Sequence, residues 1–121
     1  MNKMLTWAAA VATTAFAFTF STTALAGGDA TIGKQLVGKY NCARCHGADF
    51  NSPTEAAYPK LAGQHEDYIK HALTAYRRGG NAANGRNNAL MAPEVKPLSD
   101  SDINNIAAYL HSLPGTLVVR K

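Results

Sequence analysis

The segment Cys42-Ala43-Arg44-Cys45-His46 limits what this chain can fold into more than any other feature. Two thiols three positions apart can each add to one of the two vinyl groups on one edge of a porphyrin, and the histidine that follows then lies under the iron. Cys42 and Cys45 are the only cysteines of the chain. The motif therefore predicts a covalently attached c-type haem, around which the rest of the chain folds.

Three other interpretations of the two cysteines each need something that the sequence does not supply. A disulfide between Cys42 and Cys45 closes a very short loop and leaves His46 unexplained. A zinc site needs about four ligands, whereas the other histidines, at positions 65, 71 and 111, are scattered. A thioredoxin-like redox pair belongs among alternating strands and helices, and the sequence carries no strong strand signal. Haem attachment is the favoured interpretation.

Residues 1–26 have the features of a secretory signal peptide. Lys3 gives a positive start, residues 5–20 form an apolar run without a charge, and Ala24-Leu25-Ala26 fits the small-x-small rule of signal peptidase. We expect cleavage after Ala26, which leaves a single domain of 95 residues, 27–121, in the periplasm. An uncleaved membrane anchor is the alternative, but Thr13, Thr14 and Thr19 dilute the apolar run and a good cleavage site follows it.

The mature chain is small and mildly basic. Loss of Lys3 lowers the net charge from +4 to +3, which is too little to indicate nucleic-acid binding, and no Lys/Arg run or aromatic ladder is present. A domain of this size buries a modest fraction of its surface, so a haem would add apolar mass to the core. After cleavage Met91 is the sole methionine.

Hydrophobic periodicity predicts an all-α domain with three main helices, at about 30–41, 64–78 and 100–113. The expected end signals are Asp29 as a first N-cap, Gly79 after the second helix, and Ser99 with Asp102 as a capping box for the third. The apolar face expected of the first helix holds Ile32, Leu36, Val37 and Tyr40. Tyr68 and Tyr76 of the second helix fit either ordinary packing or hydroxyls that reach a haem propionate.

Two long segments between these helices are predicted to be loops. Residues 47–63 are expected to wrap over the haem edge. An iron-bound histidine usually donates its other ring N–H to a carbonyl or carboxylate, and the Pro59 carbonyl is our candidate, although any carbonyl of this loop would serve. Residues 81–98 contain Met91, a candidate for the haem face opposite His46. A loop this long is usually functional or disordered.

The order of these features resembles a class I cytochrome c over residues 29–113. The resemblance rests on the cysteine motif, on Pro59-x-Leu61-x-Gly63, on a late methionine and on a last helix that reads Ile106-Ala107-Ala108-Tyr109-Leu110. The chain is most similar to the short periplasmic single-haem cytochromes of proteobacteria and to each half of their two-haem relatives. This likeness implies the class I cytochrome c fold, with loops that enclose one haem.

The same resemblance implies roles for individual residues. Cys42 and Cys45 would carry the thioethers, His46 and Met91 would be the axial ligands of the iron, and the Pro59 carbonyl would accept a hydrogen bond from His46. It also implies that the first and last helices cross, with Tyr109 over a small residue, Gly33 or Gly38.

These roles imply an electron carrier of fairly high potential and not an enzyme, because an iron with six ligands has no free position for a substrate. We expect a monomer that moves single electrons between respiratory proteins. Six basic residues are expected around the haem and predict an acidic docking patch on a partner protein: Arg44, Lys60, Arg77, Arg78, Arg86 and Lys96. The alternative is that these charges are scattered over the surface and only keep the protein soluble. Two rivals are a haem enzyme or gas sensor with an open iron, and a subunit docked permanently on a larger dehydrogenase or oxidase.

Overall fold

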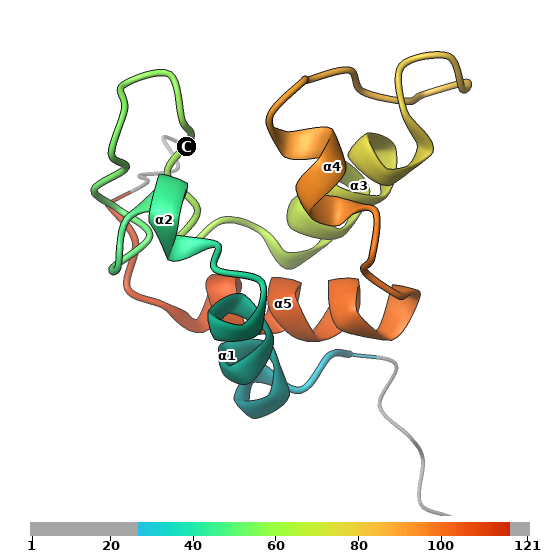
Figure 1. The fold of residues 1–121 in the computed structure, drawn as a ribbon. Helices are drawn as coiled ribbons and strands as arrows, with labels where there is room; N and C mark the ends of the chain where they lie inside the picture. Colours follow the sequence, from blue (N-terminus) through green and yellow to red (C-terminus); the bar gives the residue numbers. More distant parts are fainter. Residues whose placement is uncertain (1–26, 117–121) are drawn as a thin grey trace, which may run out of the picture.

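The computed structural model describes residues 27–116, which form five helices joined by loops, with no strand in that range (Figure 1). In chain order the helices are α1 (Ala30–Lys39), α2 (Ala43–His46), α3 (Glu66–Arg78), α4 (Met91–Val95) and α5 (Asp100–Ser112). The three long helices match the three that periodicity predicts. The predicted signal peptide lies outside the described residues. Within 27–116, no helix has the length and apolar character needed to cross a bilayer.

Helices α1 and α5 cross at close range, and Gly33 lies at the crossing (Figure 1). A Cβ atom on Gly33 would lie 2.0 Å from the backbone oxygen of Asn105 and 2.7 Å from the Cβ of Tyr109. The absence of a side chain there allows the two backbones to approach each other. The predicted contact of Tyr109 is therefore confirmed for Gly33, whereas a Cβ on Gly38 would have no atom within 4 Å.

The core gathers apolar side chains from α1, α3 and α5 and from the segments between them. Its buried members are Leu36, Val37, Phe50, Ala62, Ile69, Leu73, Val95, Leu98, Ile103, Ile106, Ala107 and Leu110. Two side chains that the periodic pattern placed on apolar faces are exposed: Ile32 by 44% and Tyr68 by 50%. Gly33 decides which side of α1 faces α5, and the preceding Ile32 is consequently turned toward solvent.

The predicted capping residues define the helix ends. The Asp29 carboxylate accepts from the N–H groups of Thr31 (2.7 Å) and Ile32 (3.1 Å). Ser99 and Asp102 form the reciprocal capping box at the start of α5, with both hydrogen bonds at 3.0 Å. These bonds satisfy N–H groups that have no partner within the helix.

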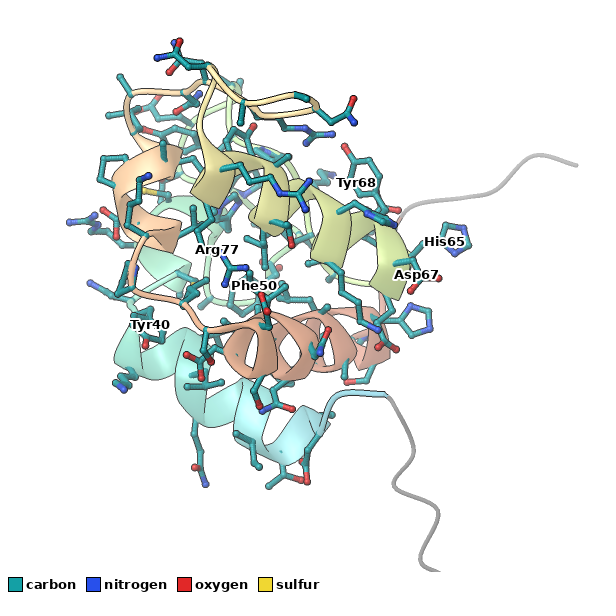
Figure 2. All side chains as sticks on the ribbon, turned by 90° about the vertical axis from the view of Figure 1, so that its right-hand side faces the viewer. Tyr40, Phe50, His65, Asp67, Tyr68 and Arg77 are labelled. Atoms are coloured by element: carbon teal, nitrogen blue, oxygen red, sulfur yellow. The ribbon has the colours of Figure 1, made fainter. Side chains whose placement is uncertain are left out.

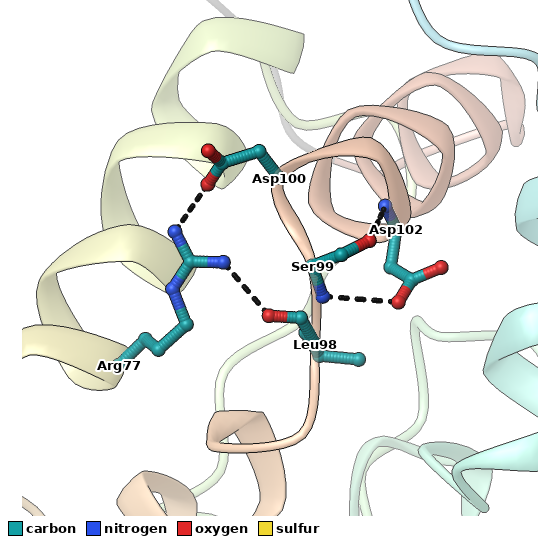
Figure 3. Close-up of polar contacts among 5 residues, drawn as sticks. All are labelled: Arg77, Leu98, Ser99, Asp100 and Asp102. Atoms are coloured by element: carbon teal, nitrogen blue, oxygen red, sulfur yellow. Dashed lines mark hydrogen bonds and ion pairs between the residues drawn. The ribbon is translucent and has the colours of Figure 1, made fainter.

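Arg77 ties α3 to the segment that enters α5 (Figure 3). Its guanidinium donates to the Leu98 carbonyl at 2.7 Å and pairs with Asp100, whose pKa it lowers. From the other side, Lys96 Nζ donates to the Arg77 carbonyl at 3.1 Å. Residues 96–100 are thereby held against α3, and this fixes where α4 can lie.

The segment 81–98 is not wholly a loop, as the sequence pattern predicted, because it contains α4, with Met91 as its first residue. The Asn88 side chain accepts from the N–H groups of Leu90 and Met91, both at 2.9 Å, and so caps the turn. Pro93 falls in the first turn, where a missing N–H costs no helical bond. Val95, which is 1% exposed, anchors the other end in the core.

Candidate functional site

A cavity of about 340 Å³ lies among the helices, and its lining is predominantly apolar. Residues of α2, α3, α4 and α5 form its walls together with the loop 57–61. Figure 1 shows α2 and α4 on opposite sides of the space above α5. Cys42, Cys45, His46 and Met91 all line this cavity, so the predicted haem-binding residues are brought together.

One wall of the cavity is the cysteine motif, coiled into a single helical turn. The backbone reverses at Asn41, whose φ of 53° is left-handed, and α2 begins directly after Cys42. Asparagine tolerates this conformation better than most residues. Both cysteines are free thiols, so the disulfide interpretation does not hold. Burial raises the pKa of the Cys42 thiol, which is therefore a neutral, apolar part of the wall.

His46 is buried and held in one orientation. Its Nδ1 lies 2.9 Å from the Pro59 carbonyl oxygen, and because a carbonyl only accepts, Nδ1 carries the proton. The other ring nitrogen, Nε2, then keeps its lone pair for a metal. Helix α2 ends at Gly47, whose φ of 81° is left-handed. A Cβ on Gly47 would lie 2.1 Å from the backbone oxygen of Ser52, so the loop that follows α2 can fold back over this position only because it is a glycine. Pro59 is the carbonyl that the structure selects from the loop.

The opposite wall carries Met91 at the start of α4, which packs against α3. The Asn88 cap and buried Val95 fix this short helix at both ends. Five residues are too few to show helical periodicity in the sequence. The one sequence signal for α4 was Asn88, three positions before Met91, because asparagine side chains often accept hydrogen bonds from the first N–H groups of a turn.

A basic and aromatic cluster forms the polar part of the lining. The Arg86 guanidinium lies 5.5 Å from the ring centre of Tyr68 and 5.6 Å from that of Tyr76, and hydrogen bonding with Tyr68 raises its pKa. The backbone N–H of Arg86 donates to the Ala75 carbonyl at 2.9 Å. No carboxylate within 27–116 forms an ion pair with the Arg86 guanidinium. Tyr68 and Tyr40 both line the cavity, and Figure 2 shows them toward opposite sides of that view. The sequence offered Tyr68 and Tyr76 as possible propionate contacts and Arg86 as a residue near the haem, but it did not predict that Arg86 lies against the two tyrosines.

The structure places half of the predicted basic residues at the cavity. Those that line it are Arg44, Lys60 and Arg86. Arg77 and Lys96 are engaged in the contacts between α3 and the entry to α5. Arg78 does not line the cavity; it lies beside a second hollow together with Arg86 and the exposed His71.

The donor set fits a haem and does not fit a bare metal ion. Among the described residues, no group of three or more His, Cys, Asp or Glu side chains could hold a metal ion. Two thiols and an oriented imidazole on one wall of an apolar cavity match a porphyrin that is attached at one edge and ligated from below. Cys42 and Cys45 are the residues that would hold it, with His46 toward the iron.

Comparison with known proteins supports this interpretation. The cytochrome c family model matches residues 30–114. Cytochrome c-554(548) of Halomonas halodenitrificans is 42% identical over 85 residues, which cover 70% of this chain and 96% of that protein.

Larger relatives match over part of their length. Cytochrome c4 of Stutzerimonas stutzeri is 40% identical over 96 residues, which are 76% of this chain and 44% of that protein. The crystal structure of reduced recombinant cytochrome c4 from Pseudomonas stutzeri superposes with a TM-score of 0.65 at 37% identity, over 75% of this chain and 48% of that one. The chain thus spans about half the length of these relatives. With its class I cytochrome c fold, this chain belongs to the cytochrome c family of electron carriers, which hold haem c covalently.

Proposed function

We propose that this protein is a periplasmic carrier of single electrons between respiratory proteins, with His46 and Met91 as the two axial ligands of its haem iron. The observation that carries the proposal is that His46 of α2 and Met91 of α4 line one apolar cavity together with Cys42 and Cys45. Figure 1 shows α2 and α4 on opposite sides above α5. Export rests on the signal-peptide pattern of residues 1–26, with cleavage after Ala26.

Haem c supplies an iron that gains and loses one electron when it is bound here. The chain's part is to hold it and to set its potential. The Pro59 carbonyl fixes the orientation of the His46 ring. The Asn88 side chain accepts a hydrogen bond from the N–H of Met91, the first residue of α4, and so holds that residue in place. A thioether sulfur is a soft donor that favours the reduced metal, so we infer a higher potential than with two histidines.

Arg86, Tyr68 and Tyr76 are our candidates for contact with the haem carboxylates. The two propionates of a porphyrin lie on the edge opposite its vinyl groups, and Tyr68, Tyr76 and Arg86 line the same cavity as Cys42 and Cys45. A half-buried guanidinium without a carboxylate partner suits an anionic group of the ligand.

The proposed partners are proteins with an acidic patch, which dock briefly at the cavity mouth. Arg44, Lys60 and Arg86 outnumber Glu94, the one carboxylate among the residues that line the cavity, so this side carries net positive charge although Arg44 is paired with Glu94. Transient redox complexes have small interfaces and depend on electrostatic guidance. We propose that the protein meets these partners as a monomer.

The test of the ligand assignment is the optical spectrum of the purified ferric protein. We expect the weak band near 695 nm that is typical of iron–methionine ligation, and we expect Met91→Ala to abolish it. Ile32→Ala is the control: Ile32 lies on α1, is 44% exposed and does not line the cavity, so its loss should leave the band in place.

Two results would contradict the assignment. A wild-type protein without the band, whose reduced form binds CO readily, would have an open iron. A band that survives in Met91→Ala would mean that another group supplies the sixth ligand.

A further inference from the structure

An ion pair joins the two walls of the cavity. Arg44 lies between the two cysteines on α2, and Glu94 lies on α4, one turn after Met91. Arg44 Nη2 lies 2.9 Å from Glu94 Oε1, and both residues line the cavity. The pair therefore crosses the mouth of the cavity at the edge where the thioethers form.

This contact has no equivalent elsewhere along the cavity. Among the described residues it is the only hydrogen bond or ion pair between the segment 42–61, which carries His46, and the segment 86–98, which carries Met91. Extensive packing joins α1 to α5, α3 to α5 and α3 to α4. The polar connection of α4 to α2 consequently depends on Arg44 and Glu94.

We propose that the Arg44–Glu94 pair is a clasp that keeps α4 close to α2 and so opposes displacement of Met91 from the iron. Both are positioning residues, because neither side chain is proposed to touch the metal. The inference rests on the proposed ligation by Met91 and concerns how firmly that ligand is kept in place. When α4 moves outward, the Met91 sulfur moves with it and an external ligand can take its position.

The strength of the clasp follows from its exposure. The side chains are 61% and 48% exposed, so solvent and salt weaken the attraction. Exposed pairs of this kind shift an equilibrium by about two- to fivefold. The ion pair is therefore strong enough to shift the equilibrium between the closed and open positions of α4. It is weak enough to break when another charged group competes for Arg44.

The experiment is a titration of the ferric holoprotein with imidazole, followed by the loss of the 695 nm band as imidazole replaces the methionine. We expect Arg44→Gln and Glu94→Gln each to bind imidazole about two- to fivefold more tightly than the wild type. Because both variants break one interaction, the double variant should bind no more tightly than either single variant. Added salt should bring the wild type toward the variants and leave the variants unchanged.

Lys70→Gln is the matched control, since it removes an ion pair with Glu66 (2.6 Å) on α3 and Lys70 does not line the cavity. Imidazole affinities equal to that of the wild type, additive effects in the double variant, or equal tightening in Lys70→Gln would each overturn the clasp while the 695 nm band stands. Absence of the band from the wild type would overturn the ligation by Met91 and the clasp with it.

Discussion

Replacing Gly33 by alanine should destabilise the protein, whereas the same replacement at Gly38 of the same helix should stabilise it. The new methyl group at position 33 would lie 2.0 Å from the Asn105 backbone oxygen, far inside contact distance, so α1 must move away from α5. At position 38 a Cβ meets no atom within 4 Å, and the backbone is helical. Both changes raise helix propensity, but only alanine at position 33 clashes with α5.

The expected size follows from two opposing effects. A clash against backbone atoms falls at the upper end of the range for overpacking, about 3 kcal/mol. Alanine regains about 1 kcal/mol of helix propensity, so the net loss for Gly33→Ala is about 2 kcal/mol. In a domain of this size that lowers the melting temperature by about 8–16 °C. Gly38→Ala should raise the free energy of unfolding by about 0.5–1 kcal/mol.

The assay is thermal unfolding of the haem-loaded proteins, followed by circular dichroism at 222 nm. The wild type and both variants are measured in the same buffer, and the haem content is checked first by absorbance. If Gly33→Ala melts with the wild type, or if both variants shift in the same direction by the same amount, the close crossing of α1 and α5 is not what this glycine provides.

Two further predictions concern the haem environment. Arg86→Gln should lower the reduction potential by roughly 20–60 mV in a spectroelectrochemical titration, because a nearby cation favours the reduced iron. Arg78→Gln, which removes a charge that does not line the cavity, should leave the potential unchanged, and equal shifts would show a general charge effect. Oxidation of the ferrous protein by the ferricyanide anion should slow with rising salt, because screening weakens the attraction between the basic side of the cavity and an anion. Oxidation by a cationic cobalt complex, which that side does not attract, should not slow. Equal salt dependence would argue against electrostatic guidance.

The long helices could be predicted because their signals are local. The Asp29 cap and the capping box of Ser99 and Asp102 act within one turn, and the periodic apolar residues of α3 and α5 span several turns. The cysteine motif likewise carries its chemistry in five consecutive residues. Such features do not depend on the rest of the fold.

Other features depend on contacts that spacing does not encode. Helix α4 has five residues, below the length at which periodicity appears, and it forms because Asn88 caps it and α3 supports it. The partners Arg44 and Glu94 are 50 positions apart. The choice of Gly33 over Gly38 at the crossing, and of Pro59 among the loop carbonyls, was likewise decided only by the packed structure.

The hydrogen bond from His46 to Pro59 has a consequence for the speed of electron exchange. The acceptor carbonyl belongs to a residue whose ring fixes φ, and the chain just beyond it is tied down by N–H groups of Leu61 and Ala62 that donate to the Phe50 carbonyl at 2.8 and 3.1 Å. In the ligation proposed above, an imidazole held by such a rigid acceptor would change position little when the charge on the iron changes. The reorganisation energy would then be low, and the distance and the difference in potential between the haem and each partner would set the rate.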